Sequence, residues 1–278
     1  MRSAGALTRL RDRLPDLATR RDRFAAAEPF PHAVIDDFLA EEDAEALVAE
    51  FARAGGDDGW TYYHHVNERK RGFPHLDRMS PAGRDVVLAL QSPEFIAALE
   101  RLTGVGPLLA DPELDGGGLH ETEPGGFLNV HTDFLSHTTR PRWSRQVNLL
   151  VFLNRGWQES WGGRCELWDG ARWQAVQRIL PVFNRCVIFR TSEISFHGSP
   201  EVVRCPPGSS RKSLALYYFR DEGAPCRLRP TRYVALPDDP PLRRALIHVD
   251  RWVLHAYSAL KRYTPLGDRV ASALLRRF

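Results

Sequence analysis

Apolar residues in the first part of the chain recur at the spacing of a helix. Residues 41–54 place Leu47, Val48 and Phe51 on one face of an acidic segment, and Gly55 follows this segment. Side chains three or four residues apart lie on one side of an α-helix, and glycine commonly ends one. We therefore predict an amphipathic helix over residues 41–54.

Two more helices are predicted from their first residues. Ser80-Pro81 and Ser92-Pro93 each place a hydroxyl before a proline, and this order suits the N-cap and the first position of a helix. The first 28 residues are polar and rich in arginine, and we predict that they are also helical.

Beyond residue 116 the pattern changes to short apolar runs between glycine, proline and aspartate. The runs predicted as strands are residues 127–134, 146–153, 165–168, 185–191 and 212–220. A shorter run at 33–39 fits an edge strand, whereas the polar and aromatic segment 57–78 is predicted to be a long loop. Short strands with irregular connections favour an antiparallel sandwich or barrel over βαβ units.

Residues 238–278 return to a helical pattern. Their apolar stripe consists of Leu242, Leu246, Val249, Val253, Ala256, Leu260 and Tyr263. The opposite face is basic. Because an apolar stripe needs a partner surface, we expect it to pack on the domain or on a second subunit of a homodimer. A membrane surface is the less favoured alternative.

Composition narrows the classes of function. The 278 residues are 43% hydrophobic and 26% charged, with a formal net charge of +3, as in an ordinary soluble enzyme. So small a net charge disfavours nucleic acid as a partner. No apolar run reaches the ~20 residues of a membrane span, and arginines interrupt the N-terminus where a signal peptide needs an apolar core. We therefore expect a cytoplasmic protein.

A metal site is predicted from histidine and aspartate rather than from cysteine. The four cysteines show no C-x-x-C spacing, which disfavours zinc and iron–sulfur centres. His131 and Asp133 lie two residues apart in a predicted strand, so both side chains point to one face. The segment between Asp133 and His197 is long enough for two or three strands, so the chain can reverse and bring His197 beside the first two residues. Two imidazoles and one carboxylate, with open coordination positions, are the ligands of non-haem Fe(II) oxygenases.

Arg211 adds a predicted binding site for a carboxylate. It begins an apolar strand, and alternation places Ser213 on the same face. A guanidinium group pairs with a carboxylate through two parallel hydrogen bonds. The alternatives are a charge at a strand end and, for His131 and Asp133, a solvated strand face. The later His197 favours the site.

Five segments together resemble the Fe(II)- and 2-oxoglutarate-dependent dioxygenases, specifically the prolyl 4-hydroxylase-like subgroup. They are residues 125–134 (GGFLNVHTDF), 152–154 (FLN), 161–163 (WGG), 196–198 (FHG) and the strand that begins at Arg211. The resemblance implies an α+β protein with a double-stranded β-helix, or jelly-roll, core and flanking helices. We accordingly divide the chain into an N-terminal helical segment (1–28), the oxygenase domain with its helices (29–222) and a basic helical tail (223–278).

The resemblance also implies the chemistry. His131, Asp133 and His197 would ligate Fe(II). Arg211, helped by Ser213, would bind the distal carboxylate of 2-oxoglutarate while the other end of this cosubstrate chelates the metal. O2 and 2-oxoglutarate would be consumed, with release of succinate and CO2, to oxidise a substrate. Related halogenases lack the carboxylate ligand, so the presence of Asp133 favours hydroxylation.

Phe152 departs from the subgroup, which often has a tyrosine here whose hydroxyl contacts the cosubstrate. Asn148, on the same strand face, is a candidate replacement donor, and His120 on the preceding segment is another. Three more histidines are expected to face solvent or substrate rather than to bind a second metal: His64, His65 and His75.

We expect hydroxylation of an unactivated C–H bond of a small molecule, such as an amino acid, a sugar or a natural-product intermediate, because no further peptide-binding domain is evident. The alternatives are hydroxylation of a prolyl residue in a peptide or protein, a binding or sensor module that retains the fold without turnover, and a cupin-like enzyme that uses no 2-oxoglutarate. The intact ligand set disfavours the sensor module, and Arg211 disfavours the cupin-like enzyme.

Overall fold

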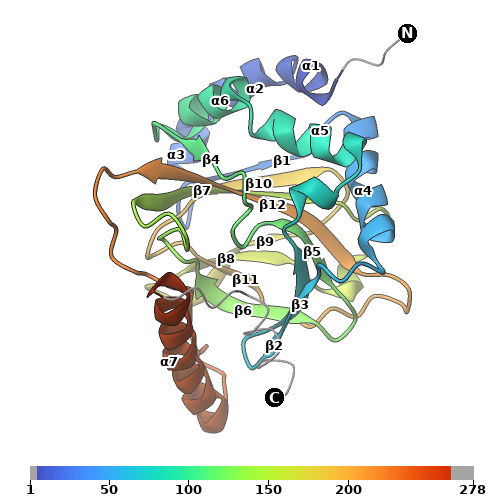
Figure 1. Cartoon of the computed structure of the whole chain (residues 1–278). Coiled ribbons are helices and arrows are strands. Elements are labelled where there is room, and N and C mark those ends of the chain that lie inside the picture. Colours follow the sequence, from blue (N-terminus) through green and yellow to red (C-terminus); the bar gives the residue numbers. More distant parts are fainter. Residues whose placement is uncertain (1–4, 264–278) are drawn as a thin grey trace.

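The computed structural model describes residues 5–263, with side chains up to residue 253. Within this part of the chain, thirteen strands form one continuous sheet in which neighbouring strands run antiparallel. The sheet curls into a half-barrel, and helices cover one side of it (Figure 1). The predicted jelly-roll core with flanking helices is confirmed.

Helices are interspersed with a few strands in the N-terminal part, a run of strands follows, and a long helix comes last. The helices are α1 (Ala6–Arg11), α2 (Leu14–Thr19), α3 (Arg21–Ala25), α4 (Glu41–Ala54), α5 (Pro81–Leu90), α6 (Pro93–Thr103) and α7 (Pro241–Tyr263), with 3₁₀ turns η1 (Leu76–Arg78) and η2 (Glu159–Trp161). The strands are β1 (His32–Ile35), β2 (Thr61–His65), β3 (Glu68–Phe73), β4 (Leu109–Ala110), β5 (Gly118–Thr122), β6 (Phe127–Thr132), β7 (Trp143–Phe152), β8 (Cys165–Asp169), β9 (Gln174–Ile179), β10 (Arg185–Arg190), β11 (Phe196–Ser199), β12 (Arg211–Asp221) and β13 (Arg232–Tyr233).

The helix starts predicted from the serine–proline pairs are confirmed. The Gly83 N–H donates to Ser80 Oγ, and the Phe95 N–H donates to Ser92 Oγ. α6 ends at Gly104, whose φ of +69° is a left-handed conformation that glycine adopts without a steric penalty. α4 has the predicted bounds, and the N-terminal segment forms the three short helices α1 to α3.

A hydrophobic core fills the space between the helices and the sheet. On the central strand β7, Val147, Leu149 and Val151 pack with the helices, whereas Leu150 and Phe152 belong to a separate cluster on the inner side of the half-barrel. Successive side chains of a strand point to opposite faces. Both faces of β7 are therefore buried, which is why this strand is a nearly continuous apolar run in the sequence.

The order of strands brings distant parts of the chain together. It runs β1-β10-β7-β12-β5-β3-β6-β11-β8-β9, so β1 lies at the edge, as predicted. β3 joins the two layers of the half-barrel, because residues 71–73 pair with β5 and residues 68–69 pair with β6. The inner faces of β7 and β12 therefore lie opposite β6 and β11.

The prediction of a long loop over residues 57–78 is wrong. Much of this segment forms the hairpin of β2 and β3, with Val66 and Asn67 at its turn. Main-chain pairing with β5 and β6 holds β3 in place, and the ion pair of Arg71 with Glu121 adds to it. Such pairing does not depend on apolar side chains, so the polar sequence gives little sign of the strands.

α7 leaves the described part of its apolar stripe exposed. Leu242 is 73% exposed and Val249 is 59% exposed, whereas Ile247, outside the stripe, is buried. The predicted packing of these residues on the domain is therefore wrong, and their packing on a second subunit stays a prediction. The stripe positions 256, 260 and 263 lie outside the described side chains. Across residues 5–263, the helices are too short or too polar to cross a membrane.

Candidate metal centre

The two histidines of the predicted metal site face each other across neighbouring strands. His131 in β6 and His197 in β11 are register partners, and their ring centroids lie 4.5 Å apart. Asp133 follows the end of β6, with Oδ1 3.5 Å from His131 Nε2 and Oδ2 3.3 Å from His197 Nε2. One potential ligand atom from each residue lies within 4.8 Å of the others. The structure thus brings together the three residues singled out in the sequence.

Both imidazoles are oriented by the backbone. His131 Nδ1 lies 2.8 Å from the Asn129 carbonyl oxygen, and His197 Nδ1 lies 3.0 Å from that of Ser195. A ring nitrogen that donates to a carbonyl leaves the Nε2 lone pair of a neutral imidazole available for a metal. Burial, and then repulsion from His197, lower the pKa of His131. His131 is therefore neutral at pH 7, as a metal ligand must be.

Asp133 is held in its ionised form. Burial alone would raise the pKa of this carboxyl, but the charge of Arg145 and contacts with both histidines hold it well below its ordinary value. Arg145 Nη2 donates to Asp133 Oδ2 over 3.0 Å, and Asn148 Nδ2 donates to the same oxygen over 2.6 Å. Two oriented imidazoles beside an ionised carboxylate fit the donor set of an Fe(II) oxygenase.

Arg145 was not singled out in the sequence. Its side chain is buried, and its guanidinium carbon lies 3.2 Å from the ring centroid of Tyr217 and 4.6 Å from that of Phe134. Its Nε also donates to Asn148 Oδ1 over 2.7 Å, so Arg145 and Asn148 together hold Asp133. The only sign in the sequence is a charged residue just before the apolar run at 146–153.

We expect Arg145→Met to weaken Fe(II) binding about 10- to 100-fold, the usual cost of losing a group that orients a metal ligand. Methionine has a similar length but leaves the buried Asp133 carboxylate without its cation. The measurement is an anaerobic Fe(II) titration at pH 7. Arg142→Met is the matched control, because Arg142 is about half exposed and pairs with Asp221 away from the centre. Equal Fe(II) affinities for the two variants would contradict this role.

Arg211 lies in the same inner cavity as the candidate metal ligands. Its Nε donates to the Gly163 carbonyl oxygen over 2.7 Å, and its guanidinium carbon lies 4.9 Å from the ring centroid of Phe152. Burial lowers the pKa of Arg211, yet a guanidinium group stays charged in proteins. In the described part of the chain no carboxylate pairs with this residue. The geometry leaves its two terminal nitrogens for a ligand carboxylate.

The other predicted cosubstrate residues line the floor of this inner cavity. Ser213 is the register partner of both Phe152 and His120. Burial, and then the charge of Lys70, lower the pKa of His120 to about 3, so its imidazole is neutral. Asn148 is engaged with Asp133, and its contact with a cosubstrate stays a prediction. Lys70 also lines the cavity, and sequence reasoning missed it because it lies in the segment predicted as a loop.

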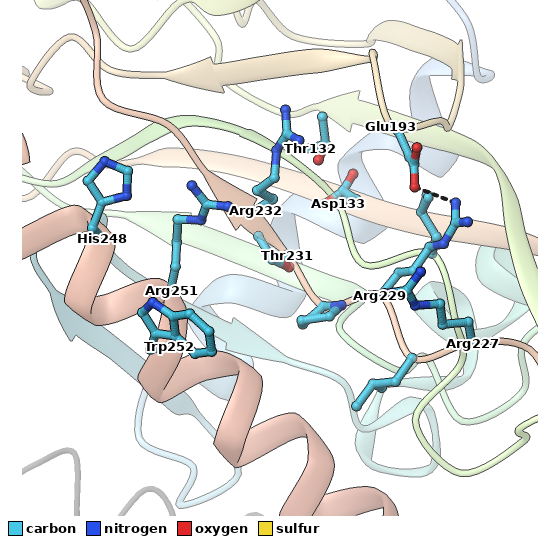
Figure 2. A pocket seen from close by; sticks show the side chains of 13 residues that line it. Thr132, Asp133, Glu193, Arg227, Arg229, Thr231, Arg232, His248, Arg251 and Trp252 are labelled. Carbon is cyan, nitrogen blue, oxygen red and sulfur yellow. Dashed lines mark ion pairs between the residues drawn. The ribbon is translucent and has the colours of Figure 1, made fainter.

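A second, larger cleft meets the inner cavity at Asp133. The inner cavity has a volume of about 70 Å³ and the outer cleft about 550 Å³. Besides Asp133, the outer cleft is lined by residues 227–232 and by the side chains of α7 that Figure 2 shows. The inner cavity is too small to hold a cosubstrate and a substrate together. The outer cleft therefore offers the space for a substrate beside the centre.

A second cluster of metal-binding residue types does not form a metal site. Asp111, Glu113 and His137 have potential ligand atoms within 4.8 Å of one another. However, His137 Nδ1 accepts hydrogen bonds from the Thr139 and Arg140 N–H groups, so its Nε2 carries the proton and faces Asp111. Arg140 pairs with Glu113. The potential ligand atoms of this cluster are therefore engaged in hydrogen bonds and ion pairs with one another and with Arg140.

His65 was expected to face solvent or substrate, but in the structure it is mostly covered by neighbouring residues and its side chain is 13% exposed. His65 Nε2 lies 3.0 Å from Glu68 Oε1, and Nδ1 lies 3.2 Å from Asp250 Oδ1 in α7. Burial by itself would lower the pKa of His65, but the hydrogen bonds to Asp250 and Glu68 raise it to about 9. The Asn67 side chain also donates to Asp250. Protonated His65 therefore helps to fasten α7 to the β2–β3 hairpin.

We expect the attachment of α7 to weaken as the pH rises. The pKa of His65 in the folded protein lies above the ordinary value of 6.5. The contribution of protonated His65 to the attachment of α7 is therefore complete below pH 6.5 and is lost as the pH rises through 9. The free energy lost is at most a few kcal/mol. Hydrogen exchange of α7 between pH 6 and 9.5, corrected for the intrinsic rate, measures it. His65→Gln should remove the pH dependence, and a dependence that persists in that variant would contradict this assignment.

Comparisons with known proteins agree with this centre. Residues 117–219 match the 2OG-Fe(II) oxygenase superfamily. The chain is 24% identical over 242 residues to the Mus musculus protein described as prolyl 3-hydroxylase OGFOD1, a match that covers 83% of this chain and 40% of the mouse protein. The chain thus spans less than half the length of that relative.

Two solved structures share the fold. One is a prolyl hydroxylase from Trichoplax adhaerens in complex with a hypoxia inducible factor peptide fragment; its TM-score is 0.53 at 16% identity, and the match covers 78% of this chain and 93% of that one. The other is a prolyl 4-hydroxylase from Phytophthora capsici, with a TM-score of 0.51 at 17% identity over 99% of this chain and 90% of that one.

Proposed function

We propose that this chain is a member of the 2OG-Fe(II) oxygenase superfamily, whose family model matches residues 117–219, and that it hydroxylates an unactivated C–H bond of a small molecule with Fe(II), 2-oxoglutarate and O2. His131, Asp133 and His197 are the proposed iron ligands. Arg211, assisted by Ser213, is the proposed partner of the distal carboxylate of 2-oxoglutarate.

The observation that carries this proposal is the shared inner cavity. It joins three candidate ligands, whose donor atoms lie within 4.8 Å of one another, to a partly buried arginine whose terminal nitrogens have no carboxylate partner among the described residues. A carboxylate bound by Arg211 in this cavity lies on the same side of the sheet as the metal ligands. A metal-binding protein that uses no 2-oxoglutarate has no need of such a partly buried cation, because withdrawing a charge from water without a partner is costly.

When bound, Fe(II) and 2-oxoglutarate would supply oxidative decarboxylation with O2 as the oxidant: one oxygen atom would enter succinate, released with CO2, and the other would hydroxylate the substrate. The residues of this chain orient the participants. Arg145 and Asn148 hold the Asp133 carboxylate, and the backbone carbonyls of Asn129 and Ser195 hold the two imidazoles. Phe152, Leu150 and Cys165 of the neighbouring apolar cluster form the apolar part of the lining of the inner cavity.

The outer cleft supports a small molecule as the substrate. Its volume of about 550 Å³ lies within the ~300–1,000 Å³ typical of sites for small ligands. The second candidate is a prolyl residue in a peptide or protein, and the similarity to the mouse prolyl 3-hydroxylase supports it.

The test combines spectroscopy with a substrate screen. Anaerobic addition of Fe(II) and 2-oxoglutarate should give a visible charge-transfer band, and its absence from correctly folded protein would refute the cosubstrate assignment. Succinate release above the substrate-free rate is then measured with a panel of small molecules and with a matched panel of proline-containing peptides. Stimulation by peptides alone would replace the small-molecule proposal with the second candidate.

A further inference from the structure

The outer cleft carries an excess of positive charge. Its charged and titratable lining side chains are Asp133, Glu193, Arg227, Arg229, Arg232, His248 and Arg251. Glu193 is paired with Arg229 over 2.5 Å, as the dashed line in Figure 2 shows. Asp133 is held by Arg145 and by the two histidines of the metal centre. Neither carboxylate is therefore free to neutralise the remaining arginines.

Three arginines of the cleft have no carboxylate partner among the described side chains. Arg227 and Arg232 belong to the segment that follows β12, whereas Arg251 reaches the cleft from α7 (Figure 2). Burial, and then the positive charge of Arg232, lower the pKa of Arg251. The fold thus brings two guanidinium groups from separate segments close enough to repel each other. Such an arrangement is stabilised when an anion lies between them.

The cleft that holds these arginines adjoins the candidate metal centre. Asp133 lines this cleft together with the arginines, so a molecule whose anionic group is bound by the arginines can extend to the metal centre. Arginine binds phosphate through two parallel hydrogen bonds. A doubly charged phosphate monoester neutralises two guanidinium groups and offers them three acceptor oxygens, whereas a carboxylate carries one charge and two oxygens. The neighbouring surface of α7 is apolar, since Trp252 is 77% exposed and Val253 is 54% exposed.

We propose that the outer cleft binds the phosphate group of the substrate, with Arg232 and Arg251 as its ligands. This inference rests on the proposed oxygenase function and names the class of substrate: a small molecule that carries a phosphate group. The phosphate belongs either to a soluble ester or to the headgroup of a lipid, and in the second case the exposed apolar residues of α7 lie next to the bilayer.

The test measures binding rather than turnover. Fe(II)-loaded protein with 2-oxoglutarate is titrated anaerobically with glycerol phosphate, and glycerol serves as the uncharged control ligand. In a second arm, the protein is sedimented with phosphatidylcholine vesicles that contain or lack phosphatidic acid. The variant is R232Q/R251Q. Its matched control is R172Q/R178Q, which removes two exposed arginines near β8 and β9 that do not line the cleft.

We expect the affinity for glycerol phosphate, or for vesicles that contain phosphatidic acid, to fall at least tenfold in R232Q/R251Q and to stay unchanged in R172Q/R178Q. Loss in the first arm identifies a soluble ester, and loss in the second arm alone identifies a headgroup. Absence of binding in both arms, or equal loss in both double variants, would overturn the proposal. The charge-transfer band of the wild-type protein is recorded in the same samples, so that failure of the oxygenase function is recognised separately.

Discussion

His131→Ala is expected to abolish the charge-transfer band with Fe(II) and 2-oxoglutarate, and 2-oxoglutarate-dependent succinate release with it. The substitution removes one of three donors whose atoms lie within 4.8 Å of one another, and no other histidine in the described chain is positioned to replace it. We expect Fe(II) affinity to fall by more than the ~100-fold upper limit for groups that only orient a ligand.

The controls separate loss of the metal from loss of the fold. His64→Ala removes an exposed histidine of β2 and should leave the band intact. The unfolding midpoint of metal-free His131→Ala protein shows whether the buried cavity left by the imidazole has destabilised the domain. A folded His131→Ala variant that still gives the band would remove His131 from the site.

Arg211→Gln is expected to raise the Kd of 2-oxoglutarate by about 100-fold, or about 2.7 kcal/mol. Its guanidinium group is held by the Gly163 carbonyl and by Phe152, with both terminal nitrogens left for a ligand. Glutamine retains a single donor group and loses the charge. Arg211→Lys keeps the charge without the planar fork, so we expect it to fall between glutamine and the wild type.

Fe(II) affinity in the absence of cosubstrate distinguishes this role from a structural one. It should be the same in Arg211→Gln and in the wild type, because the residue does not contact the candidate ligands in the structure. Titration of 2-oxoglutarate into the Fe(II)-loaded proteins, followed by the charge-transfer band, gives the Kd values. Unaltered binding of 2-oxoglutarate in Arg211→Gln would instead show that another residue binds its distal carboxylate.

The sequence was sufficient to find residues whose roles follow from local spacing. His131 and Asp133 share a strand face at two residues apart, and Ser80 and Ser92 cap the helices that they precede. Arg145 shows the limit of such reasoning. Its burial depends on Tyr217, which reaches it from a strand far along the chain, and pairwise contacts of that kind leave no periodic signal.

The outer cleft was beyond sequence reasoning for a similar reason. A net charge of +3 for the whole chain suggests no anion site. The structure places Arg232 beside Arg251 because α7 packs near β6 and β13. Two contacts hold α7 there: Arg243 donates to Asn129, and His65 pairs with Asp250. The net charge sums over the whole chain, whereas anion binding depends on the few positive side chains that lie together without a negative partner.

The order of strands also determines when during folding the metal centre forms. β1 pairs with β10 and β12 lies between β7 and β5, so most pairings close long loops, and non-local contacts of this kind slow folding. His131 and His197 meet only once β6 and β11 have paired. A refolding chain should therefore regain secondary structure before it can bind Fe(II). The time at which Fe(II) binding returns then marks the last steps of sheet assembly.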